Sequence, residues 1–154
     1  MVSNFSNLRK RGSAILLRGG GLGDFILTLP LLSYIRKQYR KVTLLTKPSY
    51  FCLTPLNKDN FECIELDLGV QSVEEQIEDS DIFTFWKDPA WEVELKKRGA
   101  SRVFTLPSRP HAKPHVIDSM FNLVGASLTT KCFTKAWLED CWQENSMIWI
   151  HPGS

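Results

Sequence analysis

The sequence predicts an α/β fold built around a parallel β-sheet. Short apolar segments of strand length alternate with longer amphipathic segments, a pattern typical of βαβ units. The first apolar segment leads directly into a glycine loop and then into a helical segment, as happens where a strand of an open α/β sheet ends. With 154 residues, the chain has the length of one domain that can bury a sizeable core.

The expected elements can be placed in chain order. Strands are predicted at Ser13–Arg18, Val42–Thr46, Glu62–Leu66, Asp81–Trp86 and Arg102–Leu106. Helices are predicted at Asp24–Tyr39, from Pro48 onward, and at Val73–Glu78, Pro89–Arg98 and His115–Val124. Gly99 and Gly125 end the last two helices in the C-cap position. Pro30 should kink the first helix or separate its first turn, because proline lacks the backbone N–H and clashes with the preceding turn.

The end of the chain has the pattern of a new unit. An apolar segment, Met147–Ile150, is followed by the turn residues His151–Ser154, which is how another βα unit would begin. We therefore interpret residues 1–146 as one domain and residues 147–154 as the first strand and turn of a truncated second domain.

The composition is that of a globular protein of modest charge. Hydrophobic residues make up 43% of the chain and charged residues 23%, which argues against a largely disordered chain. The formal net charge is only +2, so no nucleic-acid partner is expected. Residues 1–50 carry nine Lys/Arg against one acid, whereas residues 51–100 carry five against twelve. This asymmetry can steer an anionic partner to one face, although solvated surface charges explain it equally well.

The sequence also predicts a cytosolic protein. The uncharged apolar stretch Phe25–Ile35 has eleven residues, whereas a membrane-spanning helix needs about 20. The basic start and the short apolar run Ser13–Leu17 lack the length and cleavage site of a signal peptide. The four cysteines have no C-x-x-C pair and no metal-finger spacing. Buried free thiols are therefore expected at Cys52, Cys63, Cys132 and Cys141.

The glycine loop Gly19–Gly23 is the first candidate binding element. It places free backbone N–H groups and a helix N-terminus at the end of a strand, an arrangement that favours anions. The dinucleotide fingerprint G-x-G-x-x-G is matched at Gly19 and Gly21, but its third glycine is replaced by Asp24. A carboxylate there would repel a pyrophosphate, and the Gly-Lys-Ser/Thr ending of a Walker loop is missing. No cofactor is therefore expected.

Asp24 has two possible roles that its position alone leaves open. As an N-cap, its carboxylate would accept hydrogen bonds from the first N–H groups of the helix. As a general base, it would point into the cleft at the end of the sheet. Both roles place it at the helix start, where the dipole favours the ionised form.

A resemblance to a known family covers both ends of the chain. The run Ala14–Leu32, which contains Leu-Gly-Asp at Leu22–Asp24, resembles the amino-terminal motif of glycosyltransferase family 9, the ADP-heptose:lipopolysaccharide heptosyltransferases. The ending Ile148–Ser154 is similar to the family's second motif, which opens the donor-binding domain. Between them, His115–Gly125 is similar to the helix that closes the first domain.

This resemblance implies a GT-B architecture of two Rossmann-like domains, with residues 1–146 as the acceptor-side domain. Asp24 matches the family's proposed base, which takes a proton from an acceptor hydroxyl while that hydroxyl attacks the anomeric carbon and inverts it. Ser154 matches a position beside the donor diphosphate. Arg18 would meet anionic groups of the acceptor, or would equally serve as a surface ion-pair partner. The loop glycines would permit close approach of the acceptor, namely Gly19, Gly20, Gly21 and Gly23.

Three functional hypotheses follow. The first is the acceptor-binding half of an inverting transferase that moves heptose or a related sugar from a nucleotide-sugar donor to an anionic, lipopolysaccharide-core-type glycolipid. Its acceptor would bring it into peripheral contact with the inner membrane face, and the 154 residues alone would be inactive. The second is a non-catalytic remnant or anionic-glycan-binding module. The third is a nucleotide-binding oxidoreductase domain.

Two further patterns are assigned structural roles. His111 and His115 are four residues apart, but Pro110 and Pro114 make this stretch a loop, so a loop or capping role is expected and no metal site. The tryptophans are not interleaved with basic residues, so core or domain-interface packing is expected rather than stacking on nucleic-acid bases. They are Trp86, Trp91, Trp137, Trp142 and Trp149.

Overall fold

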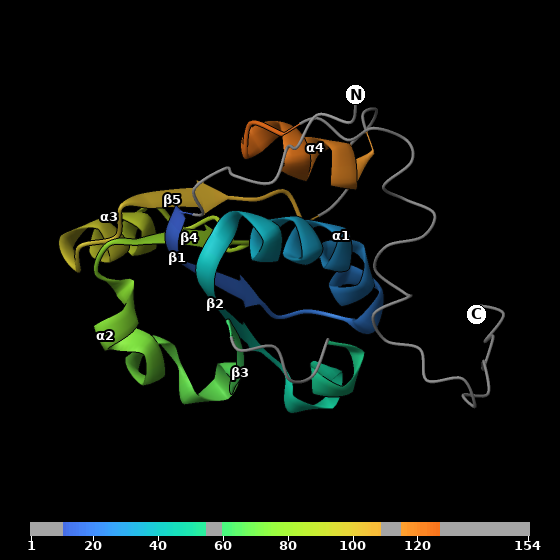
Figure 1. The fold of residues 1–154 in the computed structure, drawn as a ribbon, viewed down its shortest axis with the longest axis horizontal. Coiled ribbons are helices and arrows are strands. Elements are labelled where there is room, and N and C mark those ends of the chain that lie inside the picture. Colours follow the sequence, from blue (N-terminus) through green and yellow to red (C-terminus); the bar gives the residue numbers. More distant parts are fainter. Residues whose placement is uncertain (1–10, 55–59, 109–114, 127–154) are drawn as a thin grey trace, which may run out of the picture.

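The computed structural model describes residues 11–54, 60–108 and 115–126 (Figure 1). The predicted second-domain segment, residues 147–154 with Ser154, lies outside the described residues. So do the following residues of the sequence predictions: His111, Cys132, Cys141, Trp137, Trp142 and Trp149.

The described part of the chain folds around a five-stranded sheet in which every pairing is parallel. The strands lie in the order β3-β2-β1-β4-β5. Their bounds are β1 Arg11–Arg18, β2 Tyr39–Thr46, β3 Phe61–Glu65, β4 Ser80–Thr84 and β5 Arg102–Thr105. The predicted α/β class is confirmed, and the sheet with its helices has a Rossmann-like fold.

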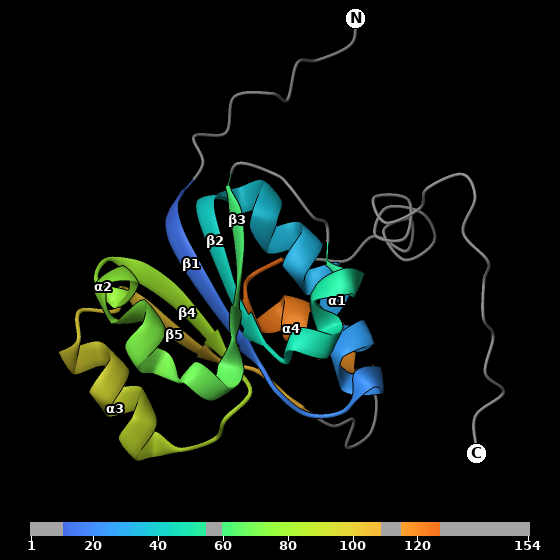
Figure 2. The same ribbon diagram turned by 90° about the horizontal axis from the view of Figure 1, so that it is seen from below.

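Helices cover both faces of the sheet (Figure 2). One face carries α1 Leu22–Gln38 and α4 Val116–Leu123, and the other carries α2 Glu74–Ile77 and α3 Pro89–Lys97. Side chains alternate along β1, so that Leu16 enters the larger core beneath α1 and α4, whereas Ile15 enters the smaller core beneath α2 and α3. The two apolar layers explain why the central strand is apolar on both faces.

Several strand ends differ from their predicted places because of contacts made across the sheet. β2 begins at Tyr39, which the sequence assigned to the preceding helix. Tyr39 is buried, pairs with Arg11 in β1, and donates a hydrogen bond to Asp81 at 2.5 Å. β4 ends at Thr84 instead of Trp86, because the chain turns away there and the Trp86 N–H donates to Thr84 Oγ1 at 3.2 Å.

Helix α1 is longer and more continuous than predicted. It begins at Leu22, two residues before Asp24, and Pro30 does not separate its first turn. The residues on both sides of the proline pack into the larger core, including Phe25, Leu29, Leu32 and Ile35. This burial outweighs the local cost of the proline, which removes one hydrogen bond from the helix.

The remaining elements follow the predicted order with changes in type. Pro48 opens a 3₁₀ helix, η1 Pro48–Leu53, and the predicted acidic helix shortens to α2, preceded by the 3₁₀ turns η2 Leu66–Leu68 and η3 Val70–Val73. Gly99 and Gly125 follow α3 and α4 with φ angles of 90° and 71°. This left-handed backbone is why glycine stands at both helix ends, as predicted.

Two predictions about exposure can be compared with the structure. None of the helices in the described ranges is long and apolar enough to cross a membrane. Cys52 and Cys63 are both free thiols, but Cys52 is exposed and Cys63 is half-buried, so burial was predicted wrongly for Cys52. Cys52 lies in η1, the 3₁₀ helix that follows β2.

Candidate functional site

The strand order places a topological switch point between β1 and β4. From β1 the chain continues through α1 to β2 on one side, whereas β4 and β5 lie on the other side of β1. Ligands of open α/β sheets bind where this reversal leaves a crevice at the carboxyl ends of the strands. Two loops border that place, Gly19–Gly21 after β1 and Phe85–Asp88 after β4.

The glycine loop lies at the carboxyl end of β1, as predicted, and closes around Asp24. Gly20 has a φ of 91°, and a Cβ added there would lie 2.9 Å from Asp24 Oδ2. A Cβ at Gly19 would come within 3.1 Å of Leu66, whereas Gly21 and Gly23 have no atom within 4 Å of the corresponding place. The close approach of Asp24 therefore requires glycine at position 20, whereas Gly21 and Gly23 have free space where a side chain would begin.

Asp24 is not the N-cap of α1, which was one of the two roles that its position left open. The N-cap is Gly21, and Asp24 stands three residues later, where its Oδ2 accepts a hydrogen bond from the Gly21 N–H at 3.4 Å. This is the backward half of a capping box. The Asp24 side chain is 45% exposed, so its carboxylate caps the helix and still faces solvent.

Arg18 holds the other side of Asp24. Its Nη2 lies 3.5 Å from Asp24 Oδ1, and its Nε and Nη2 donate to the Asp24 carbonyl at 3.3 and 3.0 Å. The guanidinium also lies over the Phe85 ring, 3.8 Å from its centroid. Burial lowers the pKa of Arg18, and the Asp24 carboxylate acts against that shift.

The role of a surface ion-pair partner, which the sequence left open for Arg18, is therefore excluded, because its side chain is only 4% exposed. A buried guanidinium whose N–H groups donate to Asp24 has little accessible surface with which to contact a ligand. Its clearest role is to hold the first turn of α1 and the Asp24 carboxylate in place.

Other contacts that sequence reasoning missed hold this loop from β2 and η1. Thr46 Oγ1 donates to the Arg18 carbonyl at 2.8 Å, and the Tyr50 hydroxyl donates to the Gly20 carbonyl at 3.2 Å. The Tyr50 ring stacks on Phe25 with centroids 4.8 Å apart. The contact of Thr46 could have been predicted, because Thr46 ends a predicted strand and neighbouring parallel strands end at the same side of the sheet. Nothing in the sequence indicated the contact of Tyr50.

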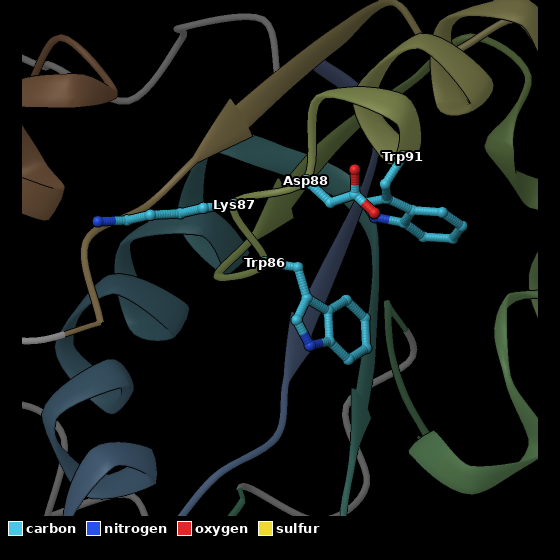
Figure 3. A pocket seen from close by; sticks show the side chains of 4 residues that line it. All are labelled: Trp86, Lys87, Asp88 and Trp91. Atoms are coloured by element: carbon cyan, nitrogen blue, oxygen red, sulfur yellow. The ribbon is translucent and has the colours of Figure 1, made fainter.

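The loop after β4 forms an aromatic pocket of about 500 Å³, lined by Trp86, Lys87, Asp88 and Trp91 (Figure 3). The two indole rings are nearly perpendicular, at 88°, with centroids 6.3 Å apart. Trp86 is 47% exposed and Trp91 is half-buried. Packing into the core of this domain was thus a wrong expectation for Trp86.

The described residues contain no cluster of three or more His, Cys, Asp or Glu side chains that could hold a metal ion. His115 instead caps α4, where its Nδ1 accepts a hydrogen bond from the Ile117 N–H at 3.4 Å. The predicted capping alternative for His115 is confirmed.

The arrangement suits a neutral polar group better than a phosphate at the start of α1. The Gly21 N–H, which a bound anion would use, already donates to the Asp24 carboxylate. The loop therefore carries its own negative charge. An exposed carboxylate held in this way can accept a proton or a hydrogen bond from a hydroxyl group.

No family model matches this sequence, and no curated protein matches it. Among solved structures, the chain is similar to RSP in complex with β-NADH, with 16% identity and a TM-score of 0.36. The similarity covers 75% of this chain and 58% of the RSP chain. A likeness of this extent carries no inference about what the present chain binds.

Proposed function

We propose that this chain is the acceptor-side domain of an inverting GT-B glycosyltransferase in which Asp24 is the general base. The donor is a nucleotide sugar carrying heptose or a related sugar, and the acceptor is an anionic glycolipid of the lipopolysaccharide-core type. The proposal is supported by the motif resemblance of residues 14–32. The observation that carries it is the exposed Asp24 carboxylate at the switch point, fixed by Arg18 and Gly21.

In the proposed reaction, an acceptor hydroxyl approaches the open side of Asp24. Its oxygen forms a bond to the anomeric carbon as the bond from that carbon to the nucleotide phosphate breaks. The hydroxyl proton passes to the Asp24 carboxylate, and the nucleotide leaves with the bonding electron pair. Attack from the face opposite the nucleotide inverts the configuration.

The contacts around Asp24 fit this role in orientation and in charge. Arg18 lies near Oδ1 and the Gly21 N–H near Oδ2, so the carboxylate is oriented before substrate arrives. A carboxylate can take this proton because the acidity of the acceptor hydroxyl rises as its oxygen bonds to carbon.

The test is a transfer assay on the full natural reading frame that encodes this chain, with an ADP-sugar and a lipopolysaccharide-core glycolipid. Asp24→Asn keeps the shape and a hydrogen-bond acceptor but removes the base. We expect transfer to fall by roughly 10²–10⁴-fold with little change in the unfolding curve.

Asp79→Asn is the matched control. Asp79 is exposed at the amino-terminal edge of the sheet, and its φ of 58° is a conformation that Asn also adopts. Transfer should be unchanged in this variant. Near-normal transfer by Asp24→Asn, or a product that retains the donor's anomeric configuration, would contradict the proposal.

A further inference from the structure

The aromatic pocket after β4 is the second wall of the switch point. Its first member, Trp86, follows Phe85, whose ring supports the Arg18 guanidinium. Arg18 in turn contacts Asp24. Phe85, the chain neighbour of the pocket residue Trp86, is thus linked to the proposed base through the Arg18 guanidinium, although it follows a different strand.

The pocket offers one open indole face with a second indole as its side wall. Trp86 is among the exposed large apolar residues of the described chain, and it packs edge-on against Trp91. Figure 3 shows the Lys87 ammonium directed away from both indole rings, so it does not fill the space beside them. A volume of about 500 Å³ is within the usual range for small-molecule sites.

A polar group capable of holding a hydroxyl, the Asp88 carboxylate, stands beside these rings. The Asp88 side chain is fixed as the N-cap of α3, where Oδ1 accepts from the Ala90 N–H at 2.9 Å. The Trp91 Nε1–H has no hydrogen-bond partner among the described residues, but it is closed to solvent, so a ligand reaches it only if the Trp91 ring moves.

We propose that this pocket binds a pyranose ring of the acceptor by stacking on the Trp86 indole. A pyranose chair presents C–H groups on one face, which pack on an aromatic ring, and hydroxyls at its edge, which need a partner such as the Asp88 carboxylate. Two perpendicular rings cannot sandwich a flat nucleobase, but they form a floor and a wall for a chair-shaped ring. The assignment of this ring to the acceptor rests on the proposed function, whereas the stacking itself does not.

The experiment follows the indole N–H signals of the chain by ¹⁵N NMR, with those of Trp86 and Trp91 assigned through Trp86→Phe and Trp91→Phe. The probes are the methyl glycosides of glucose, mannose and galactose, each added alone. We expect at least one of them to shift both assigned signals with a millimolar dissociation constant. Trp86→Ala should weaken this binding by about tenfold or more.

Val93→Ala is the matched control, because Val93 is 52% exposed on α3 and is not among the residues that line the pocket. Its binding should equal that of the unchanged chain. The absence of any shift with all three glycosides would overturn the proposal. A Trp86 signal that moves with protein concentration in the absence of sugar would also overturn it, because a second copy would then cover the ring.

The same titration on Asp24→Asn separates this inference from the proposed function. Sugar binding should persist there, because Asp24 does not line the pocket. If sugar binds at Trp86 while the full natural protein transfers none, the stacking site stands and its assignment to an acceptor is wrong.

Discussion

Asp24 is restrained by its own loop and by a strand that precedes it. The Gly21 N–H binds one carboxylate oxygen, and Arg18 lies beside the other while also holding the Asp24 carbonyl. Thr28 Oγ1 donates to the same carbonyl at 2.9 Å. A side chain restrained in this way loses little freedom when a substrate arrives, which is what the proposed role as a base requires.

Gly20 and Gly23, which both precede Asp24 in the chain, should respond in opposite ways to the same substitution. Gly20→Ala puts a Cβ at a φ of 91° and within 2.9 Å of Asp24 Oδ2, so we expect a loss of about 1–3 kcal/mol in the free energy of unfolding. Gly23→Ala meets no atom within 4 Å and lies inside α1, so it should stabilise by about 0.5–1 kcal/mol. Urea unfolding curves measure both. Equal effects would contradict the close approach of Asp24 to Gly20.

At the level of elements, α4 depends on its packing against the rest of the domain. A helix of eight residues is too short to be stable alone in water. Its buried side chains enter the larger core, and the Phe121 ring lies 5.5 Å from that of Tyr34 in α1. Burial of the face of α4 that carries Met120 therefore stabilises this helix.

Met120→Ala should test this dependence. The Met120 side chain is almost completely buried, so its truncation is expected to lower the free energy of unfolding by about 2–5 kcal/mol. Leu123→Ala on the same helix is the control, because Leu123 is 54% exposed and should change stability by less than about 0.5 kcal/mol. Chemical denaturation distinguishes the two. A small effect of Met120→Ala would mean that α4 is not held by this core.

Across the whole molecule, the amino-terminal and carboxyl-terminal ends of the parallel strands have different roles. The amino-terminal edge is tied by a polar cluster in which Arg102 and Tyr39 both donate to the buried Asp81, and Arg11 donates to the Tyr39 hydroxyl at 3.4 Å. These four residues belong to four different strands. The carboxyl-terminal edge carries the candidate site, so substitutions in the cluster should act on stability first.

This cluster makes stability depend on pH through Asp81. Burial alone would raise the pKa of Asp81, but hydrogen bonds from Arg102 and Tyr39 outweigh it and hold that pKa below its usual value. A carboxyl whose pKa is lower in the folded state stabilises the protein above its unfolded-state pKa. That contribution is lost as the pH falls through the folded-state pKa.

We therefore expect Asp81→Asn to lower the free energy of unfolding at pH 7 by about 1–3 kcal/mol. The difference from the unchanged protein should shrink as the pH falls below about 4, where the Asp81 carboxyl of the unfolded chain is protonated. Urea unfolding between neutral and acidic pH measures this difference. A difference that stays constant with pH would contradict the role of the ionised carboxylate.

Much of the fold could be predicted from local patterns in the sequence. The five strands, the glycine loop at the end of the first, and the glycines after α3 and α4 all have the predicted places within a few residues. Patterns of this kind depend on residues that are close in the chain. The predictions that failed concern the separation of the first turn of α1, one of two expected effects of Pro30, the packing of Trp86 in the core of this domain, and the burial of Cys52. In each case, contacts with distant residues or the path of the chain decided the outcome.

The sequence by itself determined that a strand, a glycine loop and a helix would place Asp24 at the end of a parallel sheet. Its alternation of short apolar and longer amphipathic segments required that arrangement. Only the tertiary structure decided which strand would lie beside the loop. Because β4 is the neighbour of β1, Phe85 packs on Arg18, Arg18 holds Asp24, and Trp86 with Trp91 opens a pocket at the same switch point. Such contacts join residues far apart in the chain, and no local pattern specifies them.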